Sequence, residues 1–355
     1  MKKYEMLLRD VLKKENNNLD LIRIIAACLV IYGHAYFISP QAGADDFVRS
    51  LIGFDYSGSM AVKVFFFISG LVVTNSYFRK KDIHDFIISR FFRIWPALIT
   101  IIVISYLYAL IATTFSASEF MASSNPLDYL VGSFFLKFTW SFPGVFSNNP
   151  SSTFNGSLWS ITYEVGCYII LMSIASLFKF NKLAISIICA MVIIDSVYQP
   201  LGVFRESIGR VEVKYLPACF AIGVISSIYQ DKIQVNIKNL STIILVTMIL
   251  NAQLSSLYEL SFYIAIMYSI LFICSRKCFI KIKPKYDISY GIYLYGFPIQ
   301  QIIHNNFKDY GISTNQLLSI TISICAGLFS WILIEKRFMN IASEISRKIT
   351  IRNTM

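Results

Sequence analysis

The 355-residue chain is 55% apolar and only 15% charged, whereas soluble domains carry roughly 25% charged residues. Its mean hydropathy is +0.59, and the apolar residues occur in long blocks, which excludes an ordinary soluble domain. The net charge of +11 fits either nucleic-acid binding or a membrane protein, so the positions of the basic residues decide between them.

Ten apolar blocks along the chain approach the roughly 20 residues that a helix needs to cross a bilayer. We therefore predict an all-α polytopic membrane protein with about ten transmembrane helices and no separate soluble domain. The predicted spans divide the chain into a cytoplasmic N-terminal segment (1–18), a transmembrane domain (19–338) and a basic cytoplasmic tail (339–355). The predicted spans are 19–38, 60–78, 95–112, 158–178, 182–199, 213–229, 239–255, 257–275, 287–304 and 314–334.

Lysine and arginine lie mainly on one side of these spans. When the N-terminus is placed inside, most of the 32 basic residues fall in cytoplasmic segments. This distribution follows the positive-inside rule and places both termini in the cytoplasm, so it explains the net charge without nucleic acid. The exceptions are Arg23 and Lys63 within spans, and Arg49, Lys137, Arg205, Arg210, Lys214 and Lys308 on the opposite side.

The first apolar run also resembles a cleavable signal sequence, because the small residues Ala42, Gly43 and Ala44 follow it. We favour a retained span. A long polar segment precedes the run, and Arg23 and His34 would be unusual in a segment that is removed. Six of the seven cysteines lie in apolar runs, where they behave as small hydrophobic residues.

Two connections are unusual. The external segment 113–157 is long enough for a lid or a binding loop, although a loop without function is the alternative. It includes an apolar piece, 126–138, that is too short to span and that we predict to be interfacial or re-entrant. The cytoplasmic connection 79–95 carries Arg90 and Arg93, three residues apart on one helical face, and Pro96 suits the beginning of the next span.

Ionisable residues within spans are functional candidates, and the first span holds two. Arg23 and His34 are 11 residues apart, so they share one helical face about 16.5 Å apart along the axis. Arg23 then lies near the cytoplasmic mouth and His34 in the outer half. A neutral imidazole suits removal of a hydroxyl proton, so we interpret His34 as a general base. The alternative is a packing histidine that bonds a neighbouring helix.

Glu164, about two turns into the fourth span, lies at a depth comparable with His34. A carboxylate bonded to one imidazole nitrogen would set its tautomer; a structural glutamate bonded to Tyr or Ser is the alternative. Ser69 and Gly70 in the second span permit close approach of a helix, for which the first span is the expected neighbour. We interpret the other charges at span ends as snorkelling side chains without a role: Lys63, Asp195, Glu212, Lys214 and Glu259.

Five sequence motifs in order resemble those of the membrane-bound acyltransferase-3 family, over roughly residues 17–338. They are 19–23 (LDLIR) followed by 33–35 (GHA), 65–70 (FFFISG), 90–96 (RFFRIWP), 159–164 (WSITYE) and 289–294 (SYGIYL). Two positions depart from the pattern. Many members have a histidine where this chain has Gly296, and the final Glu-Lys-Pro-like element reads Glu335-Lys336-Arg337. No fused hydrolase-like domain is expected, so the resemblance is to the stand-alone form.

The resemblance implies a membrane O-acyltransferase, most often an O-acetyltransferase, of the bacterial cytoplasmic (inner) membrane. The donor would be acetyl-CoA or another acyl-CoA, without a metal, and the acceptor a hydroxyl of a surface polysaccharide such as O-antigen, or of its lipid-linked precursor. Arg23, Arg90 and Arg93 would bind the donor phosphates, although positive-inside topology also explains the last two. His34, oriented by Glu164, would act by direct transfer or through an acyl-enzyme.

Two other functions also fit ten spans with buried charges. One is a transporter or channel for a small anionic solute, although no internal symmetry is evident. The other is an acyltransferase-like sensor or lipid-handling protein without catalysis. Membrane lipid is a partner in each case and nucleic acid in none, while the formation of homo-oligomers is left open.

Overall fold

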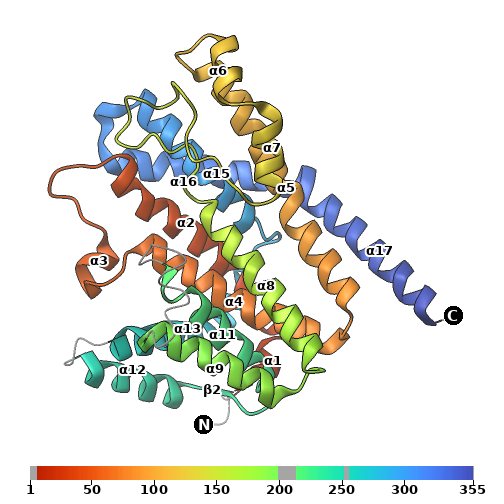
Figure 1. Cartoon of the computed structure of the whole chain (residues 1–355). Helices are drawn as coiled ribbons and strands as arrows, with labels where there is room; N and C mark the ends of the chain where they lie inside the picture. The colour runs from red at the N-terminus through yellow and green to blue at the C-terminus, as the bar shows by residue number, and fades with distance from the viewer. Residues whose placement is uncertain (1–5, 199–212, 252–255, 355) are drawn as a thin grey trace. The chain divides into compact units, whose positions relative to one another are not determined.

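Helices account for nearly all regular structure in the computed structural model of the chain, which describes residues 6–198, 213–251 and 256–354 (Figure 1). Each of the ten predicted spans coincides with a helix, so the all-α class is confirmed. These helices are α2 (Leu19–Ile38), α4 (Ser57–Lys80), α5 (Ile83–Ala112), α8 (Trp159–Leu177), α9 (Lys182–Tyr198), α11 (Leu216–Ile228), α12 (Ile237–Asn251), α13 (Ser256–Cys274), α15 (Ser289–Asn306) and α16 (Gly311–Ser330).

Within the described residues, six helices are long and apolar enough to cross a membrane: α2, α4, α5, α8, α13 and the continuous helix Gly311–Ile349. The helices α11 and α12 are apolar but shorter. The protein is thus a multi-pass membrane protein, whereas ten crossings and cytoplasmic termini stay predictions. Lys2, Lys3, Arg205, Arg210, Glu212 and the span residues 199 and 252–255 lie outside the described residues.

The chain divides into two compact units. The first comprises Met1–Ala26, Ser59–Lys81 and Cys167–Lys285, and the second comprises Ala27–Gly58, Asp82–Gly166 and Tyr286–Met355.

The N-terminal segment is packed within the first unit. Its strand β1 (Met6–Leu7) pairs antiparallel with β2 (Gln234–Val235), and the short helices α1 (Leu8–Val11) and η2 (Lys14–Asn16) follow. Near the helix α14 (Lys277–Lys281), the Asn18 amide donates to the Phe279 carbonyl at 2.6 Å. Lys283 Nζ donates to the Asn17 carbonyl at 2.9 Å. These bonds hold the start of α2, where Arg23 lies, close to α14.

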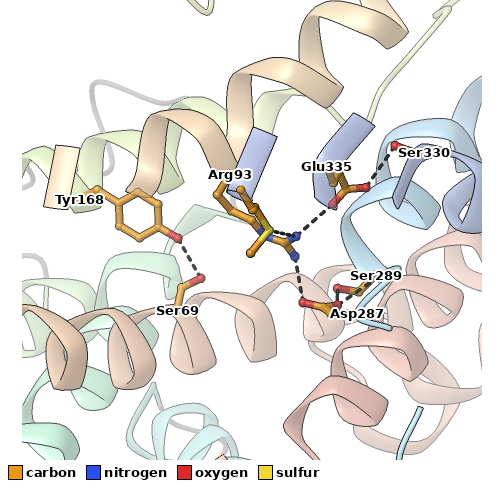
Figure 2. A network of polar contacts seen from close by, with 8 residues as sticks. Ser69, Arg93, Tyr168, Asp287, Ser289, Ser330 and Glu335 are labelled. Atoms are coloured by element: carbon orange, nitrogen blue, oxygen red, sulfur yellow. Dashed lines mark hydrogen bonds and ion pairs between the residues drawn. The ribbon is translucent and has the colours of Figure 1, made fainter. Parts of the chain in front are cut away.

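Two glycines allow α4 and α11 to pack backbone to backbone in the first unit. A Cβ atom at Gly70 would overlap the carbonyl oxygen of Phe220, and one at Gly223 would overlap that of Phe67. The Ser69 hydroxyl accepts from Tyr168 of α8 at 3.1 Å (Figure 2). The predicted close approach is confirmed, but the neighbour of Gly70 is α11. Our expectation that the first span is the neighbour of Gly70 was wrong. The missing side chains at Gly70 and Gly223 let α4 and α11 approach each other instead.

We expect Gly70→Ala to destabilise the protein by about 1–3 kcal/mol, since the added methyl forces the two helices apart. In an open helical site the same change is neutral or stabilising. Gly166→Ala is the matched control, because a Cβ there meets nothing within 4 Å. Thermal unfolding of both variants in detergent measures the difference, and equal midpoints would contradict the packing argument.

The second unit contains most of α2 and all of α3 (Phe47–Ile52), α5, α15 and α16. Past the π-helical turn η5 (Trp331–Glu335), the chain continues as α17 (Lys336–Thr354), so the predicted basic tail is helical. The helices α15 and α16 approach closely where Gly291 meets Gly327; a Cβ at Gly291 would lie 2.7 Å from the Gly327 Cα. Gln300 of α15 accepts from the Asn315 amide at its carbonyl, 3.0 Å away.

Helix α5 begins earlier than predicted. Asp82 caps it by accepting from the backbone N–H groups of His84 and Asp85, so Arg90 and Arg93 lie on the same helix as the membrane span. Pro96 lies inside this helix, and our placement of Pro96 at a helix start was wrong. A membrane helix tolerates an interior proline when neighbouring groups satisfy the freed backbone.

The long connection 113–157 has its own small core. It contains α6 (Ala117–Ser123) and α7 (Pro126–Phe134), so most of the apolar piece 126–138 is a short helix, and its interfacial or re-entrant position stays a prediction. Phe120 and Phe142 pack against Tyr106 of α5, with ring centroids 5.6 and 6.1 Å from it. Thr113 Oγ1 donates to the Pro143 carbonyl at 2.7 Å. The connection is therefore an ordered part of the second unit.

Candidate active site

His34 lies in the last turns of α2, within the second unit, and is 9% exposed. Its ring meets the ring of Phe297 edge-on, with centroids 5.1 Å apart and an interplanar angle of 70°. Among the residues that the structure describes, the buried Nδ1 atom has no hydrogen-bond partner. The imidazole therefore packs against Phe297 and has a buried nitrogen that could accept a hydrogen bond.

The connection 113–157 lies against α15 one turn beyond Phe297. The Asn149 amide donates to Gln301 at its side-chain oxygen, 2.9 Å away. The Gln301 amide in turn donates to the carbonyls of Ser151 and Thr153, at 2.8 and 2.6 Å. These buried bonds fasten the connection to the helix that contacts His34, as expected for a loop that forms part of a site.

Glu164 lies on α8, one turn after Ser160, in the same unit as His34. The Ser160 hydroxyl is 2.6 Å from the Tyr293 hydroxyl of α15, so this end of α8 is attached to the helix that contacts His34. Since Nδ1 of His34 has no described partner, orientation of the imidazole by Glu164 stays a prediction.

Arg93 forms ion pairs with two carboxylates of the second unit (Figure 2). Its Nη2 atom lies 2.8 Å from Asp287 Oδ2, and its Nη1 atom lies 3.0 Å from Glu335 Oε2. Both acids have further partners, since the backbone N–H of Ser289 donates to Asp287 at 3.2 Å and the Ser330 hydroxyl donates to Glu335 at 3.1 Å. Glu335 is 2% exposed, so this cluster is a buried salt bridge.

Aromatic residues complete the surroundings of Arg93. Its guanidinium lies 5.7 Å from the ring centroid of Tyr290 and 5.8 Å from that of Trp331. The Tyr290 hydroxyl donates to the carbonyl of Ile94 at 3.1 Å. Arg93, in segment 90–96, therefore contacts two other elements of the family pattern. These are the segment 289–294 and the last element, which contains Glu335.

The two carboxylates paired with Arg93 weaken the prediction that Arg93 binds the phosphates of the donor. A phosphate that approaches Arg93 would also approach two carboxylates, which oppose its binding. Arg90 lies one turn before Arg93 on α5, and its Nε donates to the hydroxyl of Ser89 at 3.5 Å. Arg23 lies on α2 in the first unit. Donor binding by Arg23, Arg90 and Arg93 stays a prediction.

Sequence reasoning missed Asp287 and underrated Glu335. Asp287 directly precedes the 289–294 motif, and Glu335 belongs to the last element of the resemblance, so the only available signal was their position next to motifs. An isolated acid near a span end is typical of an interface. The structure shows instead that both acids pair with Arg93.

Lys63 in the first unit is also misjudged by sequence. It is 3% exposed, donates to Ser59 Oγ at 2.7 Å, and lies 5.2 Å from the ring centroid of Tyr263. Snorkelling requires a charged end that reaches water, so that interpretation of Lys63 was wrong. Lys214 and Glu259 form an ion pair of 3.4 Å, in place of two independent interfacial charges.

Gly296, where many family members have a histidine, packs against α2. A Cβ at this position would lie 2.7 Å from Cγ1 of Ile31, so a histidine there would require the Ile31 side chain to move. His304 is buried, and its Nδ1 lies 3.1 Å from the Ser39 hydroxyl. Within residues 6–198, 213–251 and 256–354, no cluster of three or more His, Cys, Asp or Glu side chains is arranged to hold a metal ion.

The chain has long apolar helices, and several of its ionisable side chains are buried among them. These two features are typical of an α-helical membrane protein with a functional site between its helices. The chain matches the family described as "Acyltransferase domain" over residues 16–336. It therefore belongs to this acyltransferase-3 family, and it is a membrane acyltransferase.

Two relatives match over almost their full length. An "O-acetyl transferase" of Shigella phage Sf6 is 29% identical over 335 residues, which cover 93% of this chain and 98% of the relative. "Nodulation protein 10" of Rhizobium leguminosarum bv. viciae is 23% identical over 366 residues, which cover 94% of this chain and 96% of the relative. No solved structure shows a significant match.

Proposed function

We propose that the protein is an O-acetyltransferase of the bacterial cytoplasmic membrane, with ten spans and both termini in the cytoplasm. It moves the acyl group of acetyl-CoA to a hydroxyl of a surface polysaccharide or of its lipid-linked precursor. The observation that carries the proposal is His34, a buried membrane histidine with an unpartnered Nδ1 in an acyltransferase chain. The similarity to the phage O-acetyl transferase supports acetyl as the group.

The chemistry follows from the imidazole. A nitrogen of neutral His34 accepts the proton of the acceptor hydroxyl, and the oxygen attacks the thioester carbonyl. The C–S bond then breaks, and the CoA thiolate leaves and takes the proton back from the imidazolium. The alternative route places the acyl group on His34 first and then on the acceptor. Glu164 stabilises the imidazolium in both routes.

Donor binding provides the first test. A charge-assisted bond from an arginine to a phosphate contributes about 1.5–3 kcal/mol, so Arg90→Ala is expected to raise the KM for acetyl-CoA at least about tenfold. Release of free thiol by purified protein in proteoliposomes, with an acceptor present, measures this. Arg79→Ala, a basic residue at the end of α4, is the control, and an unchanged KM in Arg90→Ala would remove Arg90 from the donor site.

Identification of the acceptor tests the proposal as a whole. Mass spectrometry of surface polysaccharide is expected to show a loss of 42 Da per modified sugar, the mass of an added acetyl group, when the gene is deleted. Uptake of an anionic solute without any acetyl transfer would favour the transporter instead. Donor binding without turnover would favour the sensor or lipid-handling protein.

A further inference from the structure

The end of the external connection, residues 155–160, is bonded to the stretch of α15 that contacts His34. The Asn155 amide donates to the Leu294 carbonyl at 3.0 Å, and the Tyr293 hydroxyl donates to the Ser157 carbonyl at 2.7 Å. All of these groups are buried. This segment, which includes the first residues of α8, therefore has one defined position on α15.

Gly156 lies within this segment and contacts the ring of Phe297. A Cβ at Gly156 would be 2.5 Å from Cε2 and 2.8 Å from Cζ of Phe297. The backbone of the segment thus closes one edge of the Phe297 ring, and any larger residue at position 156 would push the ring away. Phe297 is 8% exposed, so it has little room to move.

The same Phe297 ring packs against His34. Because Nδ1 of His34 has no described hydrogen-bond partner, no bond at that atom sets the rotation of the imidazole about its Cβ–Cγ bond. The edge-on contact with Phe297 is a packing interaction that restricts this rotation. Edge-to-face geometry is the preferred arrangement of aromatic rings.

We propose that Phe297, held in place by Gly156, is a positioning residue that sets the orientation of the His34 imidazole. Residues 155–160 are then part of the reaction site and not a loop without function. This inference rests on the proposed role of His34 as general base. Proton removal requires the imidazole nitrogen to point at the acceptor hydroxyl, and small misplacements of a catalytic group reduce turnover strongly.

The test uses Gly156→Ala and Phe297→Leu in the full-length protein, with Gly166→Ala as the matched control. A methyl at Gly156 meets the Phe297 ring, whereas a methyl at Gly166 meets nothing within 4 Å. We expect kcat to fall about 10–100-fold in the first two variants, while the KM for acetyl-CoA stays the same. Gly166→Ala is expected to keep both values.

A second readout follows His34 without any need for turnover. Diethyl pyrocarbonate modifies accessible imidazoles, and peptide mass spectrometry gives a separate rate for each of the three histidines. His84, whose side chain is 65% exposed, is the internal reference in each sample. Loss of the Phe297 ring is expected to speed modification of His34 at least severalfold relative to His84, and Gly166→Ala is expected to leave it unchanged.

The two readouts separate the possible failures. If modification of His34 changes but the parent protein shows no transfer, the positioning role stands and the proposed function falls. If Phe297→Leu, folded by size exclusion and thermal unfolding, leaves both the kcat and the His34 rate at the parent values, the positioning role is overturned.

Discussion

His34→Ala is expected to reduce acyl transfer by about 10²–10⁴-fold, the usual contribution of a general base. If the acyl group passes through His34 itself, the loss is larger, because the nucleophile is removed. Acetylation of surface polysaccharide in cells and thiol release by the purified protein measure the effect. His84→Ala is the control and is expected to keep full activity, because the His84 side chain is exposed and lies in the first turn of α5.

The loss must arise from chemistry and not from unfolding. His34 contributes packing against Phe297, so we expect a modest decrease in stability and a folded protein in detergent. His34→Gln keeps polarity and part of the volume but cannot take up a proton near neutral pH. It is therefore expected to be as inactive as His34→Ala. Polysaccharide acetylation near the parent rate in either variant would remove His34 from the mechanism.

Arg93→Ala is expected to cause the largest loss of stability, about 3–5 kcal/mol, because it leaves buried carboxylates without their partner. Glu335 is 2% exposed, and the Asp287 side chain is 14% exposed. Both would have to stay charged without compensation or take up protons. Unfolding in detergent by heat or by denaturant measures the effect, and Arg90→Ala on the same helix is the matched comparison.

A double-mutant comparison separates the pairing from other effects of Arg93. Glu335→Gln in the Arg93→Ala background is expected to cost much less than Glu335→Gln alone, since the charge it removes no longer has a partner. Arg93→Lys is expected to restore only part of the stability, because an ammonium group lacks the planar fork that reaches two carboxylates. If Arg93→Ala were no more destabilising than Arg90→Ala, the cluster would be unimportant for stability.

This cluster changes how activity data on α5 should be interpreted. An inactive Arg93 variant would indicate lost donor binding only if the folded fraction is unchanged, because Arg93 joins α5 to η5 and to Asp287, just before α15. The folded fraction and the KM for the donor should therefore be measured together in both Arg93→Ala and Arg90→Ala.

Apolar blocks of bilayer length predicted the ten helices correctly, since such a block has few alternatives to a helix in lipid. The beginning of α5 was missed for a related reason. Its first turns contain His84, Asp85 and Arg90, so they lack the continuous apolar character that marks a span. Asp82, as an N-cap, was the available signal for the earlier start.

The amino-acid sequence by itself determined the membrane class, the family and the shared helix of Arg23 and His34. These depend on composition, on ordered motifs and on the 3.6-residue period, all of which are local. Only the tertiary structure decided that Arg93 pairs with Glu335, 242 positions away in sequence, and that Phe297 lies between Gly156 and His34. Such contacts depend on which helix faces pack together, and a single sequence does not encode that choice in any local pattern.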